Sequence, residues 1–217
     1  MCSKYANRPV KFLSNQANPA KIGAAVSPRP QQAAKHSSKL LILFIFMLEN
    51  LICRPLDAND LPRILHLQTE VYPGDLHETA AFFLNRLGLA AATCRVALHG
   101  PRLAGYLIAY PWNSGLPPAL NRQLAALPAD ADCWFVHDCA VAPWAQGAGV
   151  ARLMLRDSAR SAALAGLTRA SLVSLAPAVA YWEKQGYVAA AASAALAAKL
   201  AGYGEGAVYM SRSLPDQ

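Results

Sequence analysis

The feature that most constrains the fold of this chain is a strand-like segment, residues 134–141, which leads through a glycine-rich turn into a helical segment, residues 149–165. The turn spans residues 146–151, and its small side chains let the backbone approach a ligand closely. The first turn of a helix has amide N–H groups without partners in the helix, and the helix dipole adds partial positive charge there. We therefore expect this turn to bind a phosphate or pyrophosphate without any lysine.

Two other interpretations of the turn stay open on this evidence. A tight connection from strand to helix with no ligand has the same local sequence. A dinucleotide-binding turn is less well supported, because the segment has no third glycine, no first strand–helix unit and no acidic residue about 20 positions later.

The helix after the turn is predicted to have two different faces. Three apolar residues are expected to face the core: Val150, Leu153 and Met154. Three arginines recur every four residues on another face: Arg152, Arg156 and Arg160.

Strand-like and helix-like segments alternate over the rest of the chain from Leu51 onward. Strands are expected at residues 51–56, 94–98, 102–110, 134–141, 170–175 and 206–214. Helices are expected at residues 57–72, 75–86, 149–165 and 177–185, and the alanine-rich residues 189–201 favour a helix by propensity. Residues 111–130, rich in proline and asparagine, form a long connection that could line a pocket. The mixture predicts a mixed α/β domain over residues 51–214.

The charge of the chain is concentrated at its N-terminal end. The formal net charge is +7, and residues 1–48 hold seven basic residues and no acidic one, which leaves 13 bases and 13 acids from Glu49 onward. The domain therefore has no excess positive charge to attract nucleic acid, and we exclude that partner. Residues 1–50 are expected to be either a disordered basic extension or a mis-assigned one, with Met47 as the natural start.

Cysteine spacing and hydropathy exclude two further classes of protein. The five cysteines form an odd set without a C-x-x-C pair, so neither a disulfide framework nor a zinc site is expected, and no metal is predicted. Reduced thiols are typical of a cytoplasmic protein. The one long apolar run, residues 40–48, is too short for a membrane span, which needs about 20 residues.

Two segments resemble the GNAT superfamily of N-acetyltransferases. The turn reads QGAGVA over residues 146–151, and that superfamily's acetyl-CoA loop has Arg or Gln, two residues, Gly, one residue, then Gly or Ala. The segment AVAYWEKQGY at residues 178–187 is similar to the superfamily's closing helix. Within the superfamily, HDCAV at residues 137–141 and YGEGAVYM at residues 203–210 look closest to the arylalkylamine N-acetyltransferase branch.

The resemblance implies a fold and a cosubstrate. The fold would be a mixed, mostly antiparallel central sheet flanked by helices, with a splayed pair of strands at the coenzyme A site. Acetyl-CoA would be the cosubstrate, its pantetheine arm pairing with the splayed strand and its pyrophosphate lying on the loop. Carried over to this chain, the cofactor-binding residues are Cys139, Ala140, Val141, Gln146, Gly147, Ala148, Gly149, Val150, Ala151 and Trp182. Because Gln146 replaces the commoner arginine, the loop would depend more on amides than on a fixed cation.

Acetyl transfer to an amine needs a base for the ammonium proton and an acid for the leaving thiolate. The resemblance implies that His137 is the base; the alternative is a structural histidine satisfied by a neighbour. Asp138, the next residue along the strand, is expected to face the opposite side of the sheet and to be structural. The superfamily's acidic tyrosine corresponds to Trp182, whose indole N–H can donate a hydrogen bond but not a proton. Either Tyr181 or another tyrosine gives the proton, or the thiolate leaves unassisted, or the enzyme is slow. The candidate catalytic residues are therefore His137 and Tyr181.

Acceptor recognition is expected from the first two helices and the 111–130 connection. Tyr72, Tyr110 and Trp112 could form an aromatic wall, or they could be ordinary core. Glu70 or Glu78 could attract an ammonium group, or both could lie in water.

The sequence therefore predicts a cytoplasmic acetyl-CoA-dependent N-acetyltransferase. Its acceptor would be a small primary amine that attacks the thioester directly in a ternary complex, and the protein would be a monomer or a homodimer. The alternatives are an acetyltransferase for a protein N-terminus or lysine, and a non-catalytic module that binds or senses CoA, suggested by Trp182.

Overall fold

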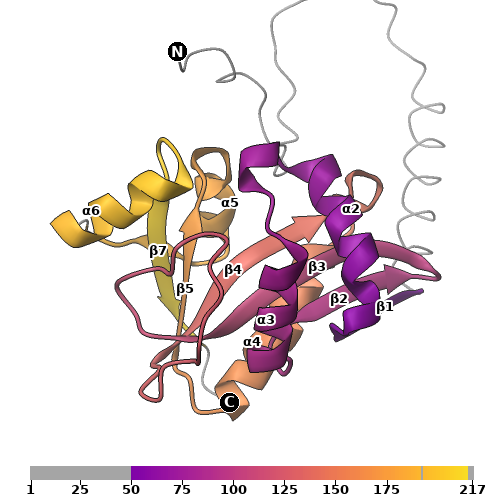
Figure 1. Ribbon diagram of the computed structural model, residues 1–217, viewed down its shortest axis with the longest axis horizontal. Helices are drawn as coiled ribbons and strands as arrows, with labels where there is room; N and C mark the ends of the chain where they lie inside the picture. The colour runs from indigo at the N-terminus through magenta and orange to yellow at the C-terminus, as the bar shows by residue number, and fades with distance from the viewer. Residues whose placement is uncertain (1–49, 192, 215–217) are drawn as a thin grey trace, which may run out of the picture.

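The computed structural model describes residues 50–191 and 193–214 (Figure 1). The prediction for the N-terminal extension therefore falls outside the described residues, apart from Asn50. No helix in the described part of the chain is both long and apolar enough to cross a membrane.

The described residues form a seven-stranded sheet in the order β1-β2-β3-β4-β5-β7-β6. Neighbouring strands are antiparallel except for β4 and β5, which are parallel. The strands are β1 (Leu51–Pro55), β2 (Arg95–His99), β3 (Arg102–Trp112), β4 (Cys133–Val141), β5 (Arg169–Ser174), β6 (Val188–Ala189) and β7 (Val208–Ser213). The prediction of a mixed, mostly antiparallel sheet is confirmed.

Helices cover both faces of the sheet, as Figure 1 shows for α3 in front and α4 behind. They are α2 (Leu61–Val71), α3 (Ala80–Ala90), α4 (Val150–Leu164), α5 (Val179–Lys184) and α6 (Ala194–Leu200), with short 3-10 turns at Ala58–Asp60, Gly74–Leu76, Pro143–Ala145, Ala176–Ala178 and Ala201–Tyr203. On one face the ring of Phe83 in α3 packs edge-on against Tyr106 of β3. On the other face the indole N–H of Trp134 in β4 donates to the Ser158 hydroxyl of α4.

Two local predictions differ from the observed elements. The second helix begins at Ala80 rather than near residue 75, because the Thr79 side chain accepts a hydrogen bond from the Phe82 amide and caps the helix there. The two-residue strand β6 was not predicted, since its alanine-rich surroundings favour helix; it exists because it pairs with β7 at the sheet edge.

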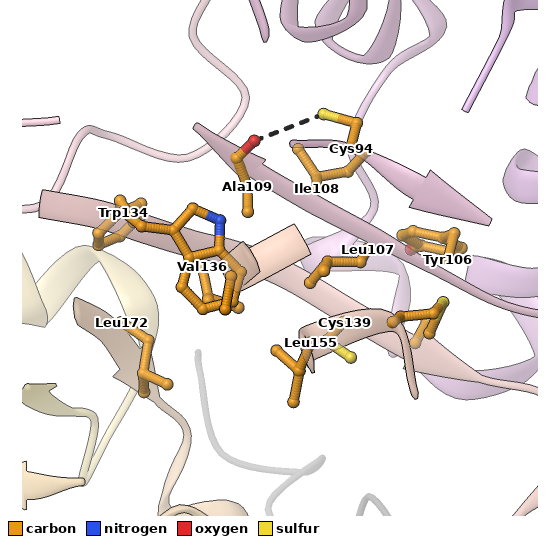
Figure 2. Close-up of a cluster of buried hydrophobic side chains, with 14 of the residues drawn as sticks. Cys94, Tyr106, Leu107, Ile108, Ala109, Trp134, Val136, Cys139, Leu155 and Leu172 are labelled. Atoms are coloured by element: carbon orange, nitrogen blue, oxygen red, sulfur yellow. Dashed lines mark hydrogen bonds between the residues drawn. The ribbon is translucent and has the colours of Figure 1, made fainter. Parts of the chain in front are cut away.

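The buried core is centred on β3, β4 and β5 (Figure 2). Apart from Cys94, which directly precedes β2, its labelled members lie on strands and on α4: Tyr106, Leu107, Ile108, Ala109, Trp134, Val136, Cys139, Leu155 and Leu172. The Cys94 thiol donates to the carbonyl of Ala109 in β3, as the dashed line marks. This packing fixes β3 and β4 as the rigid centre from which the site is built.

The two parallel strands separate near the middle of the sheet. Pairing between β4 and β5 ends at Val136 and Leu172, although β4 continues to Val141. Residues 138–141 therefore pair with β3 on one side only. This is the splayed pair of strands that the sequence predicted.

A bulge in β4 lies where the strands separate. Val136 pairs with Ala109 and Asp138 with Ile108, so His137 has no residue directly opposite it on β3. A bulge of this kind changes the direction in which side chains leave the strand.

Candidate functional site

Two cavities lie beside the opening between β4 and β5. The first, called here the central cavity, is lined by Tyr72, Leu76, Glu78, Leu120, Val136, His137, Asp138, Cys139, Leu172, Val173, Leu175, Pro177, Ala178, Trp182 and Tyr203. The second, the loop cavity, is lined by Leu51, Val141, Ala145, Gly147, Ala148, Gly149, Val150, Ala151, Arg152, Leu153, Arg156, Tyr181 and Gln185. Because Val141 and Cys139 belong to one strand, and Tyr181 and Trp182 to one helix, the two cavities are neighbours.

The glycine loop (residues 145–152) presents its backbone to the loop cavity. Gly149 has φ +75° and Gly147 φ +82°, a left-handed conformation that glycine adopts without strain. Five backbone N–H groups of this loop have no hydrogen-bond acceptor within the described residues. They belong to Gly147, Gly149, Val150, Ala151 and Arg152. Five unpaired N–H groups at a helix N-terminus form a site suited to an anion.

Two arginines add fixed positive charge to this site. Arg152 and Arg156 are exposed and line the loop cavity. A Cβ placed on Gly149 would lie 4.0 Å from the Arg152 Nη2, so that guanidinium lies over the loop. From the sequence we expected both arginines on a helix face away from the core, but we did not predict that they line this cavity.

Two details of the loop depart from the expectation. Leu153, expected in the core, is half-buried and lines the loop cavity. The lining includes Gly147 to Ala151 but neither Gln146 nor Ala140. Gln146 is half-buried beside the lining residue Ala145.

The free edge of β4 connects the two cavities. Cys139 lines the central cavity and Val141 the loop cavity, with the buried Ala140 between them. None of the three pairs with β5. Burial raises the pKa of the Cys139 thiol, and the nearby Asp138 charge raises it further, so this thiol stays protonated at neutral pH.

His137 is held on both sides of its ring inside the central cavity. Its side chain is 1% exposed, and Nδ1 lies 2.9 Å from the Tyr110 hydroxyl while Nε2 lies 2.9 Å from Glu78 Oε1. The ring of Phe82 packs against the imidazole at 4.8 Å between centroids. An ionised Glu78 only accepts hydrogen bonds, so Nε2–H donates to it and Nδ1 accepts from Tyr110.

Glu78 is fixed by a second set of bonds. Its backbone carbonyl accepts from the Gln68 side-chain amide, and its backbone N–H donates to the Gln68 side-chain carbonyl. Glu78 is 6% exposed, and its Oε2 has no hydrogen-bond partner in the described residues. The sequence named Glu78 beside Glu70 as a candidate for an ammonium group. Glu70 instead lies exposed on α2 next to His66.

Asp138 also faces the central cavity, which corrects the expectation that it faces the opposite side of the sheet from His137. The bulge at His137 breaks the alternation, so both side chains meet residues from the α2 and α3 side. The hydroxyls of Tyr72 and Tyr106 each donate to the Asp138 carboxyl at 2.6 Å. Burial raises the pKa of Asp138, and burial beside Asp138 raises the pKa of both tyrosines well above its usual value.

Tyr181 and Trp182 lie on different sides of the opening. Tyr181 is half-buried and lines the loop cavity, and burial raises its pKa above the ordinary range for a phenol. Trp182 is buried and lines the central cavity with His137. Its indole N–H has no hydrogen-bond partner within the described part of the chain.

The aromatic wall predicted for the acceptor is present only in part. Tyr72 and Tyr203 line the central cavity, whereas Tyr110 lies behind His137. Trp112 donates its N–H to the Leu116 carbonyl in the following connection. In residues 50–191 and 193–214, no three His, Cys, Asp or Glu side chains are grouped to hold a metal ion.

Comparisons with known proteins place this geometry in context. A model described as acetyltransferase (GNAT) family matches residues 61–187. A search of curated proteins gives no match.

Solved structures with the same fold share little sequence with this chain. The Ard1 protein of Thermoplasma volcanium has 11% identity and a TM-score of 0.58, covering 77% of this chain and 99% of its own. N-acetylglutamate synthase from Neisseria gonorrhoeae, complexed with coenzyme A and N-acetyl-glutamate, has 18% identity and a TM-score of 0.59; the match covers 76% of this chain and 35% of the synthase. The ribosomal-protein-S18-alanine N-acetyltransferase from Escherichia coli has 17% identity and a TM-score of 0.51; the match covers 77% of this chain and 96% of that enzyme. At these identities the likeness shows the fold.

Proposed function

Because this chain belongs to the acetyltransferase (GNAT) family, we propose that it transfers the acetyl group of acetyl-CoA to a small primary amine. The observation that carries the proposal is the arrangement of two cavities along one free strand edge. The loop cavity offers amides and arginines to a diphosphate, and the central cavity offers a buried histidine and carboxylate to an amine. Membership of the family makes the chain an acyltransferase; the acceptor is our proposal.

Acetyl-CoA would lie along the opening between β4 and β5. Its diphosphate would accept hydrogen bonds from the unpaired amides of the glycine loop and face the Arg152 and Arg156 guanidinium groups. Its pantetheine arm would meet the unpaired backbone of Cys139, Ala140 and Val141, as an added strand does. The N-acetylglutamate synthase of similar fold is complexed with coenzyme A.

The amine would enter from the side of α2 and α3. There the Glu78–His137 pair would remove the ammonium proton, which frees the nitrogen lone pair to attack the thioester carbonyl directly in a ternary complex. Tyr110 and Phe82 hold the imidazole in place during this step. We therefore propose His137 as part of the proton-accepting machinery, as the sequence suggested.

The departing thiolate has two candidate donors. Trp182 lines the central cavity, and its free indole N–H could stabilise the thiolate by a hydrogen bond without giving up a proton. Tyr181 carries an ionisable hydroxyl but lines the loop cavity, away from His137. The position of Trp182 favours it as the cofactor-binding group at the sulfur, with Tyr181 as the alternative acid.

The entrance to the central cavity favours a small acceptor over a protein. Leu120, from the connection between β3 and β4, lines the cavity, and the Tyr203 hydroxyl donates to the carbonyl of Pro118 in the same connection. The connection is further held to α3, where the Asn85 amide donates to the Leu124 carbonyl. An ordered segment here narrows the mouth, whereas a protein N-terminus or lysine needs an open groove. Within the family, the apolar lining is consistent with the arylalkylamine branch.

The remaining expectations are proposals about the whole protein. We propose that residues 51–214 are the acting domain and that the protein is a cytoplasmic monomer or homodimer. Removal of residues 1–46 tests the first proposal: the shortened chain should keep folding and activity, and a loss of either would show that the extension belongs to the domain.

An acetylation assay with thiol detection across a set of amines tests the function. Release of free CoA should depend on a small primary amine and should fail with peptide N-termini and lysine peptides. Turnover with peptides alone would favour a protein acetyltransferase. Binding of CoA without turnover on any acceptor would favour a sensing module.

A further inference from the structure

Two carboxyl groups line the central cavity beside His137. Its ionisable lining includes the carboxyl groups of Glu78 and Asp138 but no lysine or arginine. Most of the other lining side chains are apolar: Leu76, Leu120, Val136, Leu172, Val173, Leu175, Pro177 and Ala178. A molecule that fits these walls has an apolar body and, if charged, a positive charge.

The two carboxyl groups differ in how their oxygens are occupied. Both oxygens of Asp138 accept from tyrosine hydroxyls, those of Tyr72 and Tyr106. Glu78 uses only Oε1, which accepts from His137, and its buried Oε2 has no donor. A buried carboxylate oxygen without a donor costs free energy, so a partner at this position would be strongly favoured.

Both ring nitrogens of His137 are occupied by hydrogen bonds, so neither has a free lone pair to accept a proton from the substrate. Its Nε2–H donates to Glu78 and its Nδ1 accepts from Tyr110. In this arrangement the proton-accepting atom within the central cavity is an oxygen of Glu78, with His137 orienting the carboxylate.

Resting on the proposed function, we propose that Glu78 binds the acceptor's ammonium group and takes its proton, and that the acceptor is a primary amine on an apolar body without a carboxylate. The ammonium gives one proton to Glu78, and the nitrogen lone pair forms the C–N bond to the acetyl carbon. As the C–S bond breaks, its electron pair goes to sulfur. The second proton lost by nitrogen ends on that thiolate, and the proton on Glu78 passes to solvent.

The same charges exclude amino acids as acceptors. An α-carboxylate in the central cavity would lie among Glu78 and Asp138 without a lining cation. The buried guanidinium of Arg86 is not part of that lining. It lies over the rings of Phe82 and Tyr110 and donates to Asn85 and to the Arg122 carbonyl.

The test uses two probes that differ only by a carboxylate, 2-phenylethylamine and phenylalanine. The wild-type protein should acetylate the amine with a kcat/KM at least about 100-fold above that for the amino acid. Glu78→Gln should lower kcat/KM for the amine by about 100-fold and weaken its binding to the CoA-bound protein. The glutamine keeps an oxygen for His137 and leaves both backbone bonds to Gln68 in place, so the variant should fold; thermal unfolding checks this.

Glu70→Gln is the matched control, because it makes the same chemical change on the exposed face of α2 and should leave kinetics within about twofold of wild type. Equal use of the two probes, or a folded Glu78→Gln variant as active as the control, would overturn the inference while the proposed function stands. If the wild type acetylates neither probe nor any other amine, the proposed function fails. In that case, calorimetry with 2-phenylethylamine tests the ammonium site by itself. Binding to the wild type and to Glu70→Gln, but not to Glu78→Gln, would support the site, and any other result would refute it.

Discussion

Replacing Gly149 by aspartate should abolish most of the affinity for CoA while leaving the fold intact. Gly149 is the N-cap residue of α4 with φ +75°, and a Cβ there meets nothing closer than Arg152 Nη2 at 4.0 Å. The left-handed backbone costs an ordinary residue about 1–2 kcal/mol, less for Asp and Asn. The free energy of unfolding should therefore fall by no more than about 2 kcal/mol.

The effect on binding is larger because a charge is placed at the anion site. At an effective dielectric constant of about 20, two unit charges about 4 Å apart interact with about 4 kcal/mol. Solvent in an open cavity screens part of this, which leaves about 2–3 kcal/mol and weakens binding roughly 30–150-fold. The new carboxylate would also lie beside Arg152 and neutralise its charge, which would weaken the binding of CoA further.

Gly149→Asn is the matched control, since it imposes the same backbone conformation without the charge. Isothermal titration of both variants with CoA, at low and high salt, separates strain from electrostatics. The aspartate variant should bind more weakly than the asparagine variant, and the difference should shrink as salt rises. Equal affinities for the two variants would refute the assignment of the diphosphate to the glycine loop.

Four further changes test other parts of the account. His137→Ala should lower kcat about 100-fold near neutral pH and less at alkaline pH, where more amine is already neutral; pH profiles showing an equal loss throughout would make the residue purely structural. Trp182→Phe should lower kcat about tenfold in steady-state kinetics with CoA affinity unchanged, because the ring stays and the N–H is lost; an unchanged kcat would count against the thiolate contact. Gly105→Ala should destabilise the protein by about 2 kcal/mol in thermal unfolding, because its Cβ would lie 2.7 Å from the Ala140 carbonyl oxygen; an unaltered melting temperature would contradict this close approach. Burial raises the pKa of Asp138 above its ordinary value near 3.8, so the wild type should lose unfolding free energy relative to Asp138→Asn as pH rises above that ordinary value in urea titrations, and parallel curves would disprove it.

The loop and the strands around it could be predicted from sequence because their signals are local. The small residues at 146–151 lie between an apolar strand and an amphipathic helix, and each of these patterns is visible within about 20 residues. The hairpin of β2 and β3 and the helix α4 were predicted for the same reason and are confirmed.

The environment of His137 could not be predicted, because it depends on contacts between distant segments. Glu78 is 59 residues away in the chain, and no local pattern distinguishes it from the exposed Glu70. The bulge at His137 is a property of strand pairing, so alternation along one strand gave the wrong face for Asp138. Gln68, which fixes Glu78 by two backbone bonds, looked like an ordinary helix residue for the same reason.

A crystal structure of the protein with CoA tests the central claim most directly. The account predicts the diphosphate at the amides of Gly147 to Arg152, the pantetheine arm alongside residues 139–141, and the sulfur in the central cavity near Trp182. Coenzyme A bound elsewhere on the protein, or a glycine loop that makes no contact with the diphosphate, would contradict it.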